Sequence, residues 1–289
     1  MPDRSTATPI DLVHTLVRWR YRRLGFVRGS LPLENVSFSY VQFKNSSARR
    51  SLVLLHGLGT SSSTWLKIFR DLRENSTILA PDLPGFGAST LTHGKTHCSL
   101  TEHDAAIEKA LDRLPARPFT MIGHSLGGWL AMRYALKHPS NIVQLVLINP
   151  AGVLYEGVEA ARQLFNIQTR ADVLRLLDAM WHRYPWYFRP FTSAILTDLK
   201  KRGIPEFVNS ITEKDFLGVE LRQLNMPVSL IWGMEDHLIS SRTIDILAEY
   251  IPRLETFMIE RCGHIPQLER PGQLRRILHK ILEGQHELD

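Results

Sequence analysis

The stretch that decides how the chain is organised is Phe119 to Gly128, which reads FTMIGHSLGG. The run Phe119 to Ile122 has the length of a buried parallel strand, and an apolar helical pattern begins at Leu126. A turn that passes at once from strand to helix crowds its own backbone, so small residues are needed two positions either side of its tip, where Gly123 and Gly127 stand. The pattern predicts that Ser125 occupies the tip, strained, with its hydroxyl raised above the sheet.

A glycine-rich turn alone does not distinguish a nucleophilic serine from an ordinary connection. A nucleophile needs a histidine as general base and an acid that orients this histidine. Two downstream strands are each followed by one of these groups: residues 228–232 precede Asp236, and residues 255–259 precede His264. The order serine, aspartate, histidine, with each residue at the end of a strand, predicts that Ser125, Asp236 and His264 form a catalytic triad.

The alternation of strands and helices breaks between residues 152 and 221. This segment has helical patterns, one of them behind a capping threonine at position 169, but it has no strand signal. We therefore predict a helical cap over the carboxyl edge of the sheet. Its aromatic residues are expected to include three that wall an apolar substrate pocket, Trp181, Trp186 and Phe188. Packing of the cap on the core is the alternative role for these side chains.

Composition predicts an ordinary globular protein of 289 residues, 44% of them apolar and 22% charged. No apolar run approaches the roughly 18 residues of a membrane span, and no signal peptide is visible, so a cytoplasmic protein is expected. We divide the chain into a basic N-terminal arm (1–34), an α/β core (35–151 and 222–289) and the cap (152–221). Neither composition nor motif predicts the oligomeric state.

The basic excess of the chain lies in the arm. Before residue 51 there are nine basic and three acidic residues, which accounts for the whole net charge of +6. Residues 11–26 mix apolar side chains with arginines, as in a basic amphipathic helix, so residues 11–28 are a candidate contact with an anionic membrane surface. The alternative is a solvated helix packed on the domain. No base-reading motif accompanies the charge, so nucleic acid is not an expected partner.

The motifs together strongly resemble the α/β-hydrolase fold superfamily. The matching stretches are HGLG at 56–59, DLPGFG at 82–87, GHSLGG at 123–128, Trp232-Gly233 with Asp236, and GHIPQLERP at 263–271. The resemblance covers about residues 35 to 284. It implies a mostly parallel central sheet flanked by helices, with the cap inserted after strand six. Within the superfamily, the chain is similar to monoacylglycerol-lipase-like carboxylesterases, which have a similar motif before the cap, here Asn149 to Gly152.

The mechanism follows from what each group can do. His264 would take the proton of Ser125 and return it to the leaving alcohol, while Asp236 holds the imidazole in the correct tautomer. The backbone N–H groups of Leu58 and Leu126 would form an oxyanion hole. Neither a metal nor a cofactor is needed. A carboxylesterase or lipase that acts on small esters with apolar acyl chains is the expected function.

Two alternatives stay open at this point. The first is a hydrolase of the meta-cleavage type, which breaks a C–C bond in a vinylogous diketone with the same triad. The second is a receptor that binds a small ligand without turnover. Epoxide hydrolases and haloalkane dehalogenases of this fold have an aspartate where this chain has Ser125, so alkyl-enzyme chemistry is disfavoured.

Overall fold

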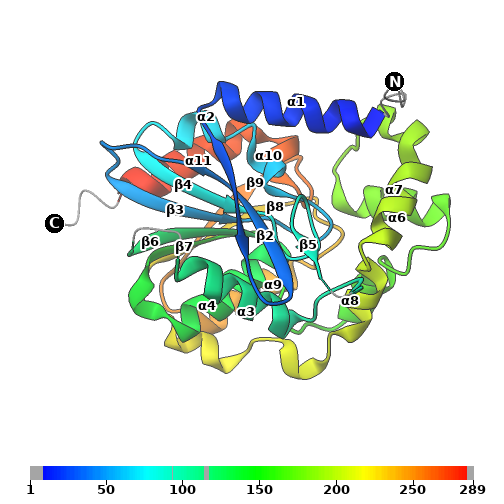
Figure 1. The fold of residues 1–289 in the computed structure, drawn as a ribbon. Coiled ribbons are helices and arrows are strands. Elements are labelled where there is room, and N and C mark those ends of the chain that lie inside the picture. The colour runs from blue at the N-terminus through cyan, green and yellow to red at the C-terminus, as the bar shows by residue number, and fades with distance from the viewer. Residues whose placement is uncertain (1–8, 93, 114–116, 285–289) are drawn as a thin grey trace, which may run out of the picture.

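The fold is built on one twisted sheet (Figure 1), and the computed structural model describes residues 9–92, 94–113 and 117–284. The strands follow the order β1-β2-β4-β3-β6-β7-β8-β9, with β5 paired to β2. Neighbouring strands from β4 to β9 are parallel, whereas β1, β2 and β5 are antiparallel additions at one edge. The strands are β1 (Val27–Pro32), β2 (Val36–Phe43), β3 (Arg50–Leu55), β4 (Ser76–Pro81), β5 (Thr90–Leu91), β6 (Phe119–His124), β7 (Ile142–Ile148), β8 (Val228–Gly233) and β9 (Leu254–Ile259).

Helices cover both faces of the sheet, which is why its central strands are apolar on both sides. In β3, for example, Val53 and Leu55 face one buried cluster while Leu52 and Leu54 face another. In Figure 1, α3, α4 and α9 lie below the sheet and α1, α2, α10 and α11 above it. Their bounds are α1 (Pro9–Arg23), α2 (Phe69–Leu72), α3 (Leu100–Leu111), α4 (Leu126–Lys137), α9 (Arg242–Tyr250), α10 (Pro266–Glu269) and α11 (Pro271–Glu283).

The segment between β7 and β8 is mainly helical, and its helices α6, α7 and α8 lie to one side of the sheet, at the right of Figure 1. Its first long helix starts where the sequence predicts: the hydroxyl of Thr169 and the carboxylate of Asp172 form a reciprocal capping box. The helices of this segment are α5 (Val158–Gln163), α6 (Arg170–Met180), α7 (Thr192–Lys201) and α8 (Ile204–Ser210), with 3₁₀ turns η3 (Trp186–Phe191), η4 (Glu213–Asp215) and η5 (Val219–Gln223).

The N-terminal region is joined to the core more closely than the sequence predicts. Tyr21 and Phe26 are buried against Phe69, with ring centroids 6.2 and 4.3 Å from it. Residues 27–32, assigned to the arm by sequence, form β1 and pair with β2. Residues 1–8 of the arm and 285–289 of the core lie outside the described residues, as do the side chains of residues 9–14. Over the described ranges, no helix has the length and apolar character needed to cross a membrane.

Candidate active site

Ser125 stands at a sharp turn between β6 and α4. Its backbone angles, φ 55° and ψ −119°, lie in a strained region that residues other than glycine rarely adopt. The flanking glycines are sterically required: a Cβ on Gly123 would lie 2.4 Å from the Gly127 oxygen, and one on Gly127 would lie 2.2 Å from the Leu55 oxygen. The turn therefore has the crowded geometry that the glycine spacing predicts.

Backbone hydrogen bonds fix this turn to the end of β7. The N–H of Ser125 donates to the Ile148 oxygen at 3.1 Å, and its carbonyl accepts from the Ala151 N–H at 3.2 Å. Leu126 is the first residue of α4, where N–H groups have no acceptor within the helix. The turn thus leaves a backbone donor next to the serine.

Asp236 and His264 lie together at the carboxyl ends of β8 and β9. The Nδ1 atom of His264 is 2.7 Å from the Oδ2 atom of Asp236, and the two side chains are 2% and 0% exposed. Because the carboxylate is an acceptor, Nδ1 carries the hydrogen, and Nε2 is left to accept a proton. The N–H of His264 donates to the Met180 oxygen at 2.7 Å, which ties this loop to the end of α6.

Asp236 accepts three further hydrogen bonds. Its Oδ1 accepts from the N–H groups of Leu238 and Ile239 at 2.9 and 3.0 Å, and its Oδ2 accepts from the Asn149 amide at 2.7 Å. The Asn149 side chain is fully buried, and its oxygen accepts from the Gly233 N–H at 3.2 Å. From the sequence, Asn149 is only part of the motif before the cap. Its contact with the acid could not be inferred, because it depends on how the ends of β7 and β8 meet.

His124, next to the serine, connects the turn to the loop of His264. Its Nε2 donates to the His264 carbonyl at 2.7 Å, and the two imidazole centroids are 4.9 Å apart. Burial, with a smaller contribution from His264, holds the pKa of His124 well below its usual value, so this imidazole stays neutral. Because His124 is neutral, it does not repel the positive charge that would develop on a protonated His264.

The loop 56–59 lies against the serine. A Cβ on Gly57 would be 3.1 Å from the Cβ of Ser125. The Gly57 carbonyl accepts from His56 Nδ1 and from the Thr60 hydroxyl, both at 2.8 Å. His56 Nε2 in turn accepts from the Leu83 N–H at 2.8 Å, which fixes the tautomer. Since the carbonyl and N–H of a trans peptide point in opposite directions, the Leu58 N–H points away from His56 and Thr60.

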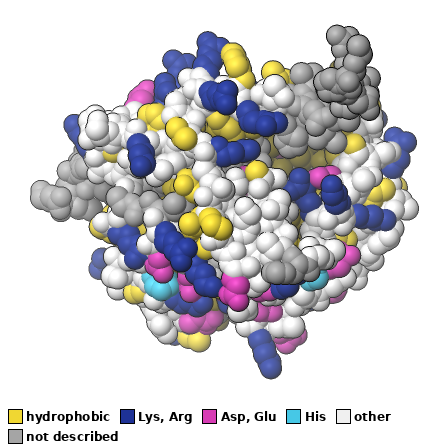
Figure 2. All heavy atoms as spheres, in the orientation of Figure 1, with side chains coloured by type: hydrophobic (Ala, Val, Ile, Leu, Met, Phe, Trp, Pro, Cys, Tyr) yellow, Lys and Arg dark blue, Asp and Glu magenta, His cyan; other side chains and the backbone are white. Residues whose placement is uncertain are grey.

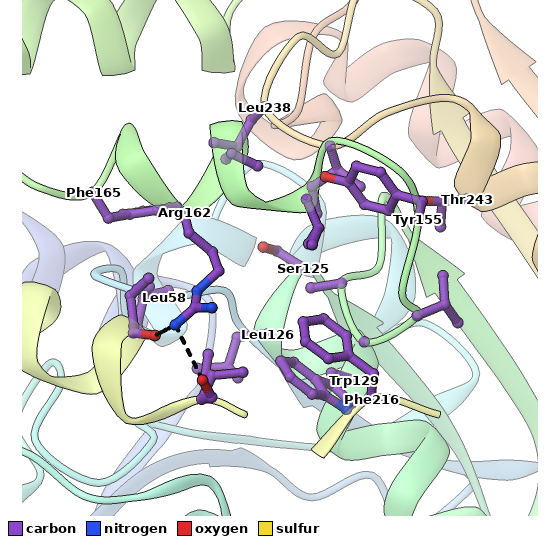
Figure 3. Close-up of a pocket in the computed structure, with 18 of the residues that line it drawn as sticks. Leu58, Ser125, Leu126, Trp129, Tyr155, Arg162, Phe165, Phe216, Leu238 and Thr243 are labelled. Atoms are coloured by element: carbon purple, nitrogen blue, oxygen red, sulfur yellow. Dashed lines mark hydrogen bonds between the residues drawn. The ribbon is translucent and has the colours of Figure 1, made fainter. Parts of the chain in front are cut away.

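A cavity opens beside Ser125 (Figure 3). Its empty volume is about 690 Å³, including space open to solvent, and its wall is almost entirely apolar. The lining residues come from the core and from α5 and α8: Leu58, Ser125, Leu126, Trp129, Ala151, Gly152, Val153, Tyr155, Val158, Ala161, Arg162, Phe165, Phe207, Val208, Ile211, Phe216, Leu238, Ile239 and Thr243.

The predicted pocket aromatics need correcting, because none of them lines this cavity. Trp181 follows the end of α6 and is buried against Phe188, with ring centroids 5.8 Å apart. Trp186 is 78% exposed. The cap helices that line the cavity beside Ser125 are α5 and α8, and no residue of the segment 181–191 lines it.

A signal for the true lining was present in the sequence. Four lining residues near the start of the cap follow the helical spacing i, i+3, i+4, i+7. They are Val158, Ala161, Arg162 and Phe165. Aromatic content favours residues 181–191 as the pocket lining. Helical spacing instead identifies the helix face that lines the cavity.

Polar groups around the cavity are few. The Arg162 guanidinium donates to the Val208 and Ile211 oxygens at 3.2 and 3.1 Å and so binds α5 to the end of α8 (Figure 3). Within the described ranges, no group of three or more His, Cys, Asp or Glu residues is arranged to hold a metal ion.

Known proteins are similar to this chain over most of its length. The model of the alpha/beta hydrolase family matches residues 52–277. The chain is 26% identical over 300 residues to the human protein "Monoacylglycerol lipase ABHD6", covering 94% of this chain and 87% of the relative. It is 25% identical over 296 residues to "Lipase 1" of Psychrobacter immobilis, covering 96% and 92%.

A solved structure shares the fold. It is described as a membrane phospholipase A and a bacterial virulence factor, and it superposes with a TM-score of 0.82 at 23% identity, covering 96% of this chain and 92% of that one. With a family model that spans most of the chain and a sheet in the matching order, the protein belongs to the alpha/beta hydrolase family.

Proposed function

We propose that the protein hydrolyses carboxylic esters through an acyl-enzyme on Ser125. The observation that carries this proposal is the buried pair of His264 and Asp236, 2.7 Å apart, in the loops that pack on the serine turn. The lipases among the relatives support an ester hydrolase over a C–C hydrolase or a receptor.

In the proposed reaction, the Ser125 hydroxyl attacks the ester carbonyl as His264 Nε2 takes its proton. The protonated imidazole then donates this proton to the leaving alcohol, which departs as the acyl-enzyme forms. A water molecule then attacks the carbonyl of the acyl-enzyme while His264 takes its proton. His264 returns this proton to the Ser125 oxygen, and the carboxylic acid is released. Asp236 stabilises the imidazolium through the Nδ1 contact and is itself held in place by three other donors.

The tetrahedral oxyanion would be bound by two backbone donors, the N–H groups of Leu126 and Leu58. Both residues line the cavity together with Ser125, and Leu126 begins a helix whose dipole favours negative charge at this end. His56 and Thr60 support the role of Leu58, because they hold the same peptide unit from its carbonyl side. One such donor contributes about 3 to 4 kcal/mol to catalysis.

The substrate class we propose is a small ester with an apolar acyl chain, of the monoacylglycerol type. An apolar cavity stabilises a hydrocarbon chain by burying its surface, about 0.8 kcal/mol for each methylene. The lining beside Ser125 offers mainly aliphatic and aromatic side chains for this burial. Relatives named as lipases support the same class.

A substrate of this kind resides in membranes, and we propose that residues 11–28 contact an anionic membrane surface. Trp19 and Leu16 of α1 are exposed beside several arginines of the same helix. Figure 2 shows Lys and Arg side chains interspersed with hydrophobic ones over the upper part of the molecule, where Figure 1 places α1. Exposed tryptophan among cations is typical of helices that lie at a lipid interface.

The experiment that tests the ester hydrolase is steady-state hydrolysis of p-nitrophenyl esters from acetate to palmitate and of a monoacylglycerol. We expect turnover by the native chain and a loss of at least about a thousandfold in the Ser125→Ala variant. A maximum at medium or long chains would support the apolar acyl pocket. Turnover of a vinylogous diketone without turnover of any ester would contradict the proposal.

A further inference from the structure

The 3₁₀ turn η3 presents aromatic side chains to solvent. Trp186, Tyr187 and Phe191 are 78%, 54% and 49% exposed. Single exposed apolar residues are ordinary, but three large rings within six residues form an apolar patch that needs an explanation. Tyrosine and tryptophan are enriched at boundaries between an apolar phase and water, because each side chain has an apolar ring and a polar group.

The turn is held in place from inside. Phe188 packs on the buried Trp181, and the Tyr187 ring lies 5.3 Å from Phe188 and 6.2 Å from Trp186. One aromatic side chain therefore anchors the turn while its neighbours point outward. Because the exposed rings are attached to an anchored turn, a partner can bury them with little loss of conformational entropy.

Basic residues lie on one side of this patch, next to Tyr187. An open groove that includes Tyr187 is also lined by four cationic side chains, Lys67, Arg183, Arg261 and Arg270. Two carboxylates share the groove, but Glu269 already accepts from the N–H groups of His182 and Gly263 at 3.1 and 3.2 Å. A further cation, Arg189, stands on η3 itself.

We propose that η3 and this basic groove form a second membrane contact, which docks the cap on a bilayer of anionic phospholipid. The aromatic rings would lie at the level of the headgroups, and the lysine and arginine side chains would contact the lipid phosphates. This inference extends the proposed contact of residues 11–28 to the cap. It does not depend on ester hydrolysis, since its test measures binding alone.

Charge favours a lipid surface over a second copy of the chain. A symmetric dimer would bring the same patch of each copy together and would therefore oppose two sets of cationic side chains. An anionic bilayer neutralises these cations and accepts the aromatic rings at the same time.

The test is cosedimentation of the full chain with phosphatidylcholine vesicles, with and without phosphatidylglycerol. The cap variant is Trp186→Ser with Tyr187→Ser and Phe191→Ser. The matched control replaces three exposed apolar residues outside the cap patch, Val143, Val219 and Met258, with serine; these are 42%, 62% and 45% exposed. We expect the cap variant to lose about tenfold or more in affinity for the anionic vesicles, and the control to bind like the native chain.

A charge variant tests the groove separately. Replacing Arg183, Arg189 and Arg261 with glutamine should weaken binding to vesicles with phosphatidylglycerol and flatten its dependence on salt. Thermal unfolding followed by circular dichroism serves as the folding control, because Arg183, Arg189 and Arg261 are all exposed and their replacement should leave the fold intact.

Two results would overturn the inference. In one, the cap variant binds anionic vesicles as well as the native chain, and only neutralising the arginines of α1 removes binding. In the other, the cap variant keeps its lipid affinity but changes from dimer to monomer in sedimentation velocity, which would assign the patch to a second copy of the chain.

Discussion

Asn149 holds the aspartate of the candidate site, because its side-chain amide donates to Asp236. We predict that Asn149→Ala lowers kcat about 10- to 100-fold, the usual effect of losing a hydrogen bond to a charged group. The physical reason is that Asp236 loses the amide 2.7 Å away and the Gly233 N–H loses its acceptor. Steady-state kinetics with a p-nitrophenyl ester measure the effect.

The KM should change little in this variant, because Asn149 is not part of the cavity lining. Asn141→Ala is the matched control, since its amide also donates to a side chain, the hydroxyl of Tyr134 at 3.0 Å, but outside the site. Equal losses of kcat in the two variants would show that Asn149 has no special role in positioning the acid.

Thr60 holds the peptide unit that presents the Leu58 N–H. Its hydroxyl is one of two side-chain donors to the Gly57 carbonyl. We predict that Thr60→Val lowers kcat roughly 2- to 10-fold, the range for one neutral hydrogen bond, because the Leu58 peptide becomes less well oriented. Thr197→Val, which removes a hydroxyl bonded to the Ser193 oxygen on α7, should leave kcat unchanged. An unaffected kcat in Thr60→Val would contradict the orienting role.

At the scale of residues, the sequence predicts what local chemistry dictates and little of what depends on contacts. The strain at Ser125 follows from two glycines at a fixed spacing, and the structure confirms why each must lack a side chain. The hydrogen bond between Asn149 and Asp236 joins residues 87 positions apart. No local pattern encodes such a distance.

At the scale of elements, α5 forms one wall of the cavity. Ala161 faces the cavity, whereas its neighbour Ala160 is exposed on the other side of the helix. We predict that Ala161→Phe shifts the preferred p-nitrophenyl ester to a shorter acyl chain, because the ring occupies space next to Ser125. Ala160→Phe should keep the native preference. The same chain-length profile in all three proteins would contradict the assignment of this wall.

The strands of the parallel sheet and the turn at Ser125 could be predicted because each depends on a short local pattern. β6 and β8, for example, are apolar runs that end in glycine-containing turns, and both are fully buried. The orientation of the cap could not be predicted in this way. Each cap helix has an apolar side, and the sequence does not state which of these sides meets the core, the cavity or the solvent. The sequence therefore predicts Trp186 and Phe188 as pocket residues, although Trp186 is exposed and Phe188 packs on Trp181.

At the scale of the whole molecule, buried histidines should make stability depend on pH. Burial lowers the pKa of His103 to about 3, and it also lowers the pKa values of His56 and His124. The unfolded chain binds these protons near a pKa of about 6.5, whereas the folded protein does not. The free energy of unfolding should therefore be highest above that pH and fall as the pH decreases, by up to about 1.4 kcal/mol per pH unit for each histidine.

His103→Phe separates one of these contributions. The ring of His103 stacks on Phe86 at 6.0 Å and meets Phe207 edge-on at 5.5 Å, so phenylalanine suits the site. Urea unfolding at several pH values between about 5 and 7 should show that the free energy of unfolding changes less steeply with pH in this variant, by a difference that approaches one proton toward pH 5. An unchanged slope would show that His103 does not stay neutral in the folded protein.

The position of the N-terminal region also belongs to this scale. The sequence predicts the basic amphipathic character of α1, but the pairing of β1 with β2 and the burial of Phe26 on Phe69 depend on the finished sheet. Residues 27–32 therefore belong to the sheet, and the arm ends before residue 27 and not at the predicted boundary, residue 34.

The proposed ester hydrolysis requires that Ser125 is a nucleophile activated by His264. It is tested most directly by treating the full chain with an alkyl fluorophosphonate and locating the adduct by peptide mass spectrometry. We predict one adduct, on Ser125, formed with loss of fluoride, absent in Ser125→Ala and much slower in His264→Ala. No adduct in the native chain, or an adduct that persists in Ser125→Ala, would contradict the account.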